Sequence, residues 1–324
     1  MSRGGDAPGF SPVASDRMND RILVTGSEGL VGRVLRQSLA ARGSEIVGLD
    51  LRGSGCERGD VRDGRQVCDA IAGCRGIVHL AAVSRVVWAE RAPDICRDTN
   101  IGGLRCVLEA ALDQPACPWF LFASSREVYG QPGHLPATED TPLSPVNVYG
   151  RSKVEGERLV EEARASGLRT ATVRLSNVYG SILDHPDRVV PAFAHAAVEG
   201  RAIRIDGAEC IFDFTHIEDT VRGMVAVMER LDAGETLPPL HLLTGEPTTL
   251  RELAAMATAC AGKRLPIVEA PPRPFDVSRF HGDPSRAREF LGWEPRVGLR
   301  DGFGRLVRDL RARSGAIMCE MAAP

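Results

Sequence analysis

The 324-residue sequence lacks the features that mark membrane-spanning and nucleic-acid-binding proteins. No segment approaches the roughly 20 consecutive apolar residues that a spanning helix needs. No run of basic residues is present, and the formal net charge is only −3, so bulk electrostatics favour neither nucleic acid nor an anionic membrane. We therefore expect a soluble, cytoplasmic protein with no nucleic-acid partner and no membrane partner.

Cysteines at the spacing of a metal or redox site are also missing. The nine cysteines are scattered, and neither a C-x-x-C pair nor a Cys/His cluster with zinc-ligand spacing occurs. These absences favour reduced thiols of a cytosolic protein, and we expect no metal site. The cysteines are Cys56, Cys68, Cys74, Cys96, Cys106, Cys117, Cys210, Cys260 and Cys319.

What the chain does contain, from Arg21 onward, is an alternation of short apolar runs with longer helical stretches. Hydrophobic residues make up 43% of the sequence, enough for a substantial core. The alternation predicts βαβ units, and therefore an α/β fold with a doubly wound parallel sheet covered by helices on both faces. The apolar runs include RILVTG, EIVGLD, GIVHLAA and WFLFASS.

The chain divides into four expected regions. Residues 1–20 lack an apolar signal segment and are rich in Gly, Ser, Pro and Asp, which predicts a disordered leader. Residues 21–180 contain the regular alternation and form the expected Rossmann domain. Residues 181–312 contain proline-rich connections, which predicts a smaller C-terminal lobe with segments returning to the core. Residues 313–324 are expected to form a tail.

Three glycines follow the first predicted strand, where the first helix begins. Gly26, Gly29 and Gly32 have the spacing G-x-x-G-x-x-G in TGSEGLVG. Such glycines let the backbone turn tightly and approach a pyrophosphate, whose charge is favoured by the free N–H groups of a helix N-terminus. Close packing of a helix on a strand produces similar patterns, so the turn alone leaves both interpretations open.

Two carboxylates follow at the ends of later strands. Asp50 ends the second predicted strand, where a carboxylate accepts hydrogen bonds from an adenosine ribose. A 2′-phosphate would be repelled there, which favours NAD over NADP, although Arg52 stands two residues later. Asp60, in GDV, is either an adenine contact or an exposed loop carboxylate.

Tyr149 and Lys153 are four residues apart at the start of a predicted helix and therefore share one face. A lysine ammonium favours a nearby phenolate, which lowers the pKa of a tyrosine from about 10 toward neutral pH. Tyr149 can then accept a proton from a hydroxyl group. The same spacing occurs by chance on helix surfaces, but here it follows a candidate dinucleotide turn.

These residues belong to an ordered series of motifs. The series consists of TGSEGLVG at 25–32, HLAA at 79–82, DTNIGG at 98–103, SSREVYG at 124–130, YGRSK at 149–153, RLSNVYG at 174–180, FDFTHIED at 212–219 and LGWEP at 291–295. Together these motifs resemble the extended short-chain dehydrogenase/reductases, and most closely their sugar-nucleotide (NAD-dependent) epimerase/dehydratase family. The resemblance covers residues 21 to about 310 and is more specific for the family than for the reaction. It implies a Rossmann fold with a smaller C-terminal substrate-binding lobe.

The resemblance also implies roles for individual residues. Ser125 matches the catalytic Ser/Thr that holds the substrate hydroxyl, Tyr149 the base, and Lys153 the residue that bridges the nicotinamide ribose. Positions that match cofactor contacts are Gly26, Gly29, Leu30, Gly32, Asp50, Asp60, Val61, Leu80, Ala81, Ala82, Asn100, Tyr149, Lys153 and Val178. Positions that match substrate contacts are Ser84, Ser125, Arg126, Asn177, Val190 and Arg273.

The Arg126-Glu127 pair bears on the class of reaction. The 4,6-dehydratases resemble T-D-E-V-Y-G here; their Glu removes the C5 proton and their Asp protonates the departing C6 hydroxyl. Glu127 keeps the glutamate, but Arg126 replaces the aspartate and cannot donate a proton as an acid does. GDP-mannose dehydratases and glucuronate decarboxylases resemble T-S-E, whereas many 4-epimerases have small residues at both positions. Glu127 is therefore either a catalytic base or a loop carboxylate paired with Arg126.

Phe212 is a second departure from the family pattern. Sugar-nucleotide members usually resemble R-D-F at this point, and their Arg contacts the substrate diphosphate. The loss of that charge-assisted donor leaves open a reductase or dehydrogenase that acts on a non-nucleotide substrate. A non-catalytic dinucleotide sensor is disfavoured, because Ser125, Tyr149 and Lys153 are all present.

From the resemblance we expect an NAD-dependent enzyme that oxidises C4 of a nucleoside diphosphate sugar and yields its 4-epimer. The main alternative is a 4,6-dehydratase or decarboxylase that uses Glu127. A homodimer is also expected, paired through the helix near residues 94–112 and the helix that carries Lys153. An apolar stripe in the first of these helices fits such an interface, or equally packing on the protein's own sheet. The stripe is Ile101, Leu104, Leu108 and Ala111.

Overall fold

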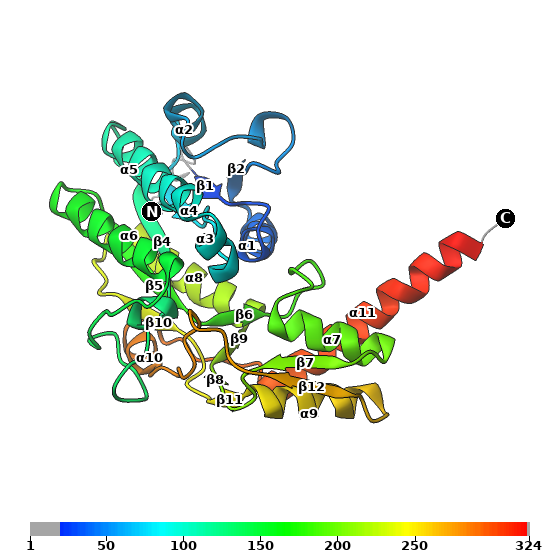
Figure 1. The fold of residues 1–324 in the computed structure, drawn as a ribbon. Helices are drawn as coiled ribbons and strands as arrows, with labels where there is room; N and C mark the ends of the chain where they lie inside the picture. Colours follow the sequence, from blue (N-terminus) through cyan, green and yellow to red (C-terminus); the bar gives the residue numbers. More distant parts are fainter. Residues whose placement is uncertain (1–19, 323–324) are drawn as a thin grey trace, which may run out of the picture.

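The computed structural model describes residues 20–322, with side chains described up to residue 314. The predicted leader therefore lies outside the described residues, except for Asp20. Six strands form one parallel sheet in the order β10-β5-β4-β3-β1-β2, the predicted doubly wound α/β arrangement (Figure 1). These strands are β1 (Arg21–Thr25), β2 (Glu45–Leu49), β3 (Gly76–His79), β4 (Trp119–Ser125), β5 (Thr170–Leu175) and β10 (Leu240–Leu242).

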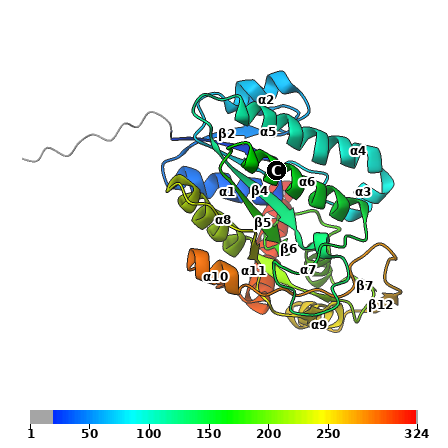
Figure 2. The same cartoon turned by 90° about the vertical axis from the view of Figure 1, so that its left-hand side faces the viewer.

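Helices cover both faces of the sheet (Figure 2). Successive residues of a strand point to opposite faces. Ile22 and Val24 of β1 therefore pack in the core under α1, α8 and α10, whereas Leu23 packs in the core under α2, α5 and α6. These helices are α1 (Leu30–Ala41), α2 (Gly64–Ile71), α5 (Leu104–Leu112), α6 (Val148–Ala165), α8 (Ile217–Asp232) and α10 (Ser285–Leu291).

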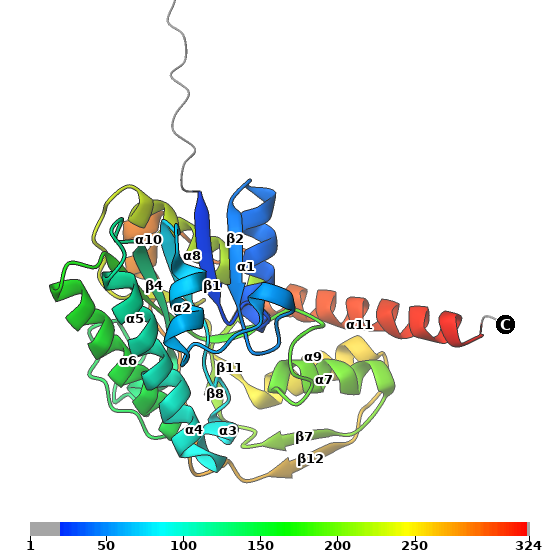
Figure 3. The same cartoon turned by 90° about the horizontal axis from the view of Figure 1, so that it is seen from above.

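A smaller lobe, with its own hydrophobic core around Phe193, Leu253 and Phe303, lies beside the sheet (Figure 3). The elements β10, α8 and α10 also follow residue 180, yet they pack on the main sheet. The elements of the lobe and of its junction with the sheet are β6 (Asn177–Tyr179), α7 (Val189–Glu199), β7 (Ile203–Asp206), β8 (Ile211–Phe212), β9 (Phe214–His216), β11 (Thr248–Thr249), α9 (Leu250–Ala261), β12 (Ile267–Ala270) and α11 (Leu299–Ala322). Residues 313–322, which were expected to form a tail, continue α11.

The remaining elements are short and join the strands to the larger helices. They are α3 (Val86–Arg91), α4 (Pro93–Arg97), the turns η1 (Gly55–Glu57) and η3 (Arg126–Tyr129), and the π-helical segment η2 (Asp98–Gly103). Within residues 20–322, no helix has the length and apolar character needed to cross a membrane.

The apolar stripe before and along α5 belongs to the core of the chain itself. Leu104 and Ala111 are 0% exposed and Leu108 is 4% exposed, and all three lie in the cluster between α5 and the sheet. Ile101 packs against the same cluster. Of the two interpretations of the stripe, packing on the protein's own sheet is therefore the correct one.

Candidate active site

Three groups of predicted site residues lie where the parallel strands end. The glycine turn follows β1, residues 80–82 follow β3, and Ser125 is the last residue of β4. Because β1, β3 and β4 are parallel neighbours, their carboxyl ends meet at one edge of the sheet. Ligands of open α/β sheets bind at this edge.

The turn between β1 and α1 accepts only glycine at two of its positions. Gly26 has a φ of +67°, and a Cβ there would lie 2.7 Å from the backbone nitrogen of Ala81. A Cβ on Gly32 would lie 2.3 Å from the carbonyl oxygen of Gly26. Helix α1 follows Gly29 without a side-chain cap, so its first N–H groups can donate to an anion. This cradle fits a dinucleotide pyrophosphate.

Asp50 is held by groups around it. Its carboxylate is 8% exposed, accepts the backbone N–H of Glu28 at 3.0 Å and that of Arg52 at 2.8 Å, and lies 3.4 Å from the Arg52 guanidinium. Arg52 is the cation that weakened the argument for NAD over NADP. The structure pairs it with Asp50 itself. Asp60 forms a two-oxygen pair with Arg62, whose hydrogen bonds lower the pKa of Asp60.

Tyr149 and Lys153 lie in the first two turns of α6 and are both buried, at 9% and 3% exposure. The Lys153 ammonium donates to the carbonyl oxygen of Ala123 at 2.7 Å. Its nitrogen lies 4.8 Å from the centre of the Phe122 ring and 5.8 Å from that of Tyr149. The side chains therefore share one face of α6, as the spacing predicts.

The pKa of Tyr149 differs from the sequence-based expectation. Burial raises it to about 12, and the neighbouring Ser125 hydroxyl only partly opposes this shift. Burial also lowers the pKa of Lys153 to about 8, against the opposing effects of Cys96 and Glu157. The predicted lowering of the Tyr149 pKa is therefore absent from the protein alone, because desolvation of the phenolate outweighs the charges around it.

The two serines of the motif have different partners. Ser125 caps η3, where its Oγ accepts the backbone N–H of Glu127 at 3.2 Å, and its hydroxyl neighbours the Tyr149 phenol. The Ser124 hydroxyl instead donates to Glu157 of α6. Of the two serines, Ser125 is therefore the one that lies beside Tyr149.

Arg126 and Glu127 form a buried ion pair with 2.8 Å between Nη2 and Oε1, and each side chain is 8% exposed. The other carboxylate oxygen of Glu127 accepts the Asn147 amide at 2.7 Å. The Arg126 guanidinium lies 5.1 Å from the ring centre of Phe212 and 5.7 Å from that of Phe280. The two departures from the family pattern, Arg126 and Phe212, therefore contact each other.

Asn100 and Ser84 lie in the region after β3. The Asn100 amide accepts the backbone N–H of Val83 at 2.7 Å and donates to the Ser152 hydroxyl at 2.9 Å. It ties the loop after β3 to α6, beside the predicted cofactor contacts of residues 80–82. Ser84 is exposed on that loop.

The predicted residues of the second lobe differ in burial. The Asn177 amide donates to the carbonyl oxygen of Asp213 at 3.1 Å, and Val178 is buried in β6. Val190 is 2% exposed, within the core of the lobe. Arg273 is 46% exposed and pairs with Asp276 at 2.7 Å, so this guanidinium is accessible from solvent.

Sequence reasoning missed two arginines near the site. The charge of Arg188 opposes the burial-driven rise of the Tyr149 pKa. Arg85, after β3, pairs with Asp187 at 2.6 and 2.9 Å, which joins the loop after β3 to the loop before α7. Residues 181–188 belong to no recognised motif, so the sequence carried no signal for either contact.

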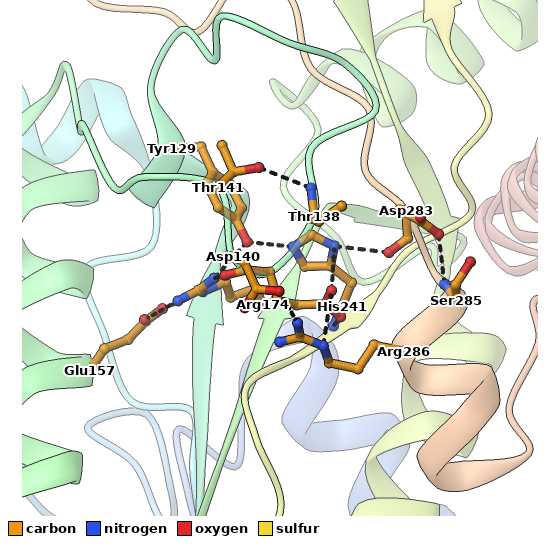
Figure 4. A network of polar contacts seen from close by, with 11 residues as sticks. Tyr129, Thr138, Asp140, Thr141, Glu157, Arg174, His241, Asp283, Ser285 and Arg286 are labelled. Carbon is orange, nitrogen blue, oxygen red and sulfur yellow. Dashed lines mark hydrogen bonds and ion pairs between the residues drawn. The ribbon is translucent and has the colours of Figure 1, made fainter.

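A second network of buried polar side chains contacts the SSREVYG segment at Tyr129 (Figure 4). Arg174 of β5 forms a two-oxygen pair with Glu157 at 2.9 and 2.7 Å and donates to the Tyr129 hydroxyl at 2.6 Å. Burial lowers the pKa of His241 to about 4, so this ring is neutral; its Nδ1 donates to the carbonyl oxygen of Asp283. The Tyr129 hydroxyl therefore donates to His241 Nε2 at 2.5 Å, and Tyr129 has a structural role in this network.

Among the described residues, no group of three or more His, Cys, Asp or Glu side chains is placed to hold a metal ion. The arrangement at the end of β4 instead offers a hydroxyl, a phenol and an ammonium beside a dinucleotide cradle. Such a set can move a proton to and from a substrate hydroxyl.

Both the sequence and the fold are similar to those of known proteins. Residues 22–239 match the sequence profile of the NAD dependent epimerase/dehydratase family. The chain is 30% identical over 306 residues to UDP-glucose 4-epimerase of Streptomyces lividans, covering 86% of this chain and 92% of that protein. It is 31% identical over 316 residues to dTDP-glucose 4,6-dehydratase of Streptomyces griseus, covering 90% and 94%. The solved structure of MoeE5 in complex with UDP-glucose and NAD has a TM-score of 0.84 at 27% identity, covering 91% of this chain and 99% of that chain.

Proposed function

Because the chain belongs to the NAD-dependent epimerase/dehydratase family, we propose that it is a 4-epimerase of a nucleoside diphosphate sugar and works through a 4-keto intermediate. It is an NAD-dependent enzyme. Bound NAD supplies a reversible hydride acceptor for C4. The observation that carries the 4-epimerase assignment is the pairing of Glu127, which forms an ion pair with Arg126 through one carboxylate oxygen and accepts the Asn147 amide with the other.

The side chains at the end of β4 and the start of α6 handle the proton. The charge of Lys153 and the positive charge that the nicotinamide ring of NAD would bring when bound favour the phenolate of Tyr149, against the effect of burial. As the phenolate, Tyr149 takes the proton of the C4 hydroxyl while Ser125 holds the same oxygen. The Lys153 ammonium lies 5.8 Å from the centre of the Tyr149 ring and would hold the nicotinamide ribose of bound NAD, as the resemblance implies. Tyr149 returns the proton to the C4 oxygen of the inverted sugar, so substrate and product are isomers and no proton is gained or lost overall.

The second candidate is a 4,6-dehydratase or decarboxylase, because Glu127 occupies the position of the dehydratase base and dTDP-glucose 4,6-dehydratase is a relative at 31% identity. A dehydratase also needs an acid for the departing C6 hydroxyl. Arg126 holds the position of that acid, and a guanidinium does not release a proton at physiological pH. The 4-epimerase assignment is therefore preferred.

A product assay separates these reactions. The protein is incubated with NAD and, in turn, with UDP-glucose, UDP-glucuronic acid and dTDP-glucose, and the nucleotide sugars are followed by NMR. We expect one of them to yield its 4-epimer without net formation of NADH. Accumulation of a 4-keto-6-deoxy sugar, or of a pentose with release of carbon dioxide, would assign the second candidate instead.

Asp50 is expected to decide the choice between NAD and NADP. Replacing it with Ala removes a carboxylate acceptor for the adenosine ribose, which should weaken NAD binding about ten- to a hundredfold, the range of a hydrogen bond to a charged group. The preference for NAD over NADP should shrink, because the charge that repels a 2′-phosphate is gone. Calorimetric titration with both cofactors measures this, with the exposed Asp69→Ala on α2 as control. Equal affinity of the unaltered protein for both cofactors would contradict the assignment.

We extend the proposal to the substrate contacts and the assembly. Arg273 supplies an exposed cation for the substrate diphosphate, since Phe212 stands where other family members have an arginine. Further substrate contacts come from Ser84, Asn177 and Val190. The homodimer rests on the resemblance alone, since the stripe through Leu104 packs inside the chain.

A further inference from the structure

Arg126, Glu127 and Asn147 form a continuous chain of polar contacts from the C-terminal lobe to the start of α6. At one end, the Arg126 guanidinium lies 5.1 Å from the ring centre of Phe212, in β8. Its Nη2 pairs with Glu127 at 2.8 Å, and Glu127 accepts the Asn147 amide at 2.7 Å. At the other end, Asn147 Oδ1 accepts the backbone N–H of Gly150 at 2.7 Å and caps α6.

Glu127 is the charged member of the three groups that set which way the Asn147 amide faces; the others are the carbonyl oxygen of Phe275 and the N–H of Gly150. The amide NH₂ has two donors, which go to Glu127 and to the carbonyl oxygen of Phe275 at 3.1 Å. A flipped amide would turn its oxygen toward the Glu127 carboxylate and another carbonyl oxygen, so three acceptors would face one another. Only the observed orientation leaves Oδ1 free to cap α6.

The cap lies next to the catalytic tyrosine. Tyr149 is the second residue of α6, between the cap residue Asn147 and the capped N–H of Gly150. The fit is close, because a Cβ on Gly150 would lie 2.6 Å from the carbonyl oxygen of Glu127. The orientation of Asn147 and the position of the turn that carries Tyr149 are thus linked through the cap.

We propose that Glu127 is a positioning residue, which fixes the amide of Asn147 and so places Tyr149, and that Arg126 and Phe212 hold Glu127 in this role. The burial of both charged side chains makes the pair sensitive to the loss of either member. The Arg126 guanidinium lies over the ring of Phe212, a contact that the planar, weakly hydrated guanidinium makes well. The inference rests on the proposed function only where turnover is the readout.

A double-mutant cycle tests this role. Glu127→Ala, Asn147→Ser and the double variant are compared, because serine caps a helix with its own hydroxyl and needs no partner at Glu127. Glu127→Ala alone should lower kcat at least about tenfold with little change in KM, whereas in the Asn147→Ser background the same change should cost less than about threefold. Equal losses in both backgrounds would overturn the proposal.

Glu127→Gln distinguishes positioning from proton transfer. The glutamine carbonyl oxygen still accepts the Asn147 amide while its NH₂ faces Arg126, so the cap is kept although the ion pair is lost. Turnover should therefore stay within about tenfold of the unaltered protein, with the cost of the lost ion pair appearing in stability. A general base would lose a factor on the order of 10² to 10⁴. Glu161→Gln, at a glutamate of α6 whose side chain is 69% exposed, is the matched control. A loss of activity by a factor on the order of 10² to 10⁴ in Glu127→Gln would assign Glu127 to proton transfer and overturn the proposal.

Hydrogen exchange supplies a readout that needs no substrate. The N–H of Gly150 is protected by its bond to Asn147, so Glu127→Ala should speed exchange in the first turn of α6 at least about tenfold. Glu127→Ala should leave exchange unchanged in the Asn147→Ser background. Unchanged exchange in Glu127→Ala itself would overturn the proposal, whereas failure of the enzyme to act on any nucleotide sugar would count against the proposed function alone.

Discussion

Tyr149→Phe is expected to lower turnover by a factor on the order of 10² to 10⁴, since in the proposed 4-epimerase Tyr149 takes the C4 hydroxyl proton. The ring of Tyr149 is buried, at 9% exposure, and phenylalanine fills the same space. The substitution removes only the hydroxyl, so the packing of the ring is kept. The fold and the affinity for NAD should therefore stay intact. Steady-state kinetics measures the loss, and stabilisation by NAD in thermal unfolding shows that the cofactor still binds.

Tyr179→Phe is the matched control for this substitution. Tyr179 is 1% exposed, and its hydroxyl makes only a 3.5 Å contact with the carbonyl oxygen of Leu299, away from β4. Its loss should leave turnover within a few-fold of the unaltered protein. Retention of more than about a tenth of the activity by Tyr149→Phe would show that another group carries the proton.

Glu157→Gln is expected to lower the free energy of unfolding by about 3–5 kcal/mol, the range observed when one partner of a buried ion pair is removed. The Arg174 side chain is 5% exposed and Glu157 supplies both of its carboxylate contacts, so the substitution leaves a buried cation without a counter-charge. Ser124 also loses its carboxylate acceptor. Urea denaturation measures the change in stability.

Two further variants test whether the loss of stability in Glu157→Gln comes from the unpaired charge of Arg174. Glu161→Gln, on the exposed side of α6, should change stability by no more than about 0.5 kcal/mol. Removing both charges, as in Glu157→Leu with Arg174→Met, should recover part of the loss because no unpaired charge remains. A loss below about 1 kcal/mol in Glu157→Gln would contradict the assigned role of the pair.

The sequence predicted the parts of the site that depend on local residue types. The glycine turn, the strand alternation and the Tyr149-Lys153 face follow from backbone freedom and helical periodicity over a few residues. The structure places each of them where the motif predicts. The family profile and the relatives agree with the resemblance that these motifs carry.

The features that the sequence could not predict depend on distant contacts or on burial. Phe212 stands far from Arg126 in the chain, and only folding brings the ring against the guanidinium. Burial raises the pKa of Tyr149 to about 12, an effect that no pattern of neighbouring residues reveals. The predicted residue bounds of the domains and the cytoplasmic location stay predictions.

Turnover in heavy water tests the central claim most directly. A 4-epimerase that returns the hydride to the carbon it came from gives a product with no solvent deuterium on the sugar ring, and a deuterium label placed at C4 of the substrate stays at C4 of the inverted sugar. We predict this result for whichever nucleotide sugar the product assay identifies. Solvent deuterium at C5 of the product would contradict the account, because it would show that a base, with Glu127 at the position of the dehydratase base, removes the C5 proton during turnover.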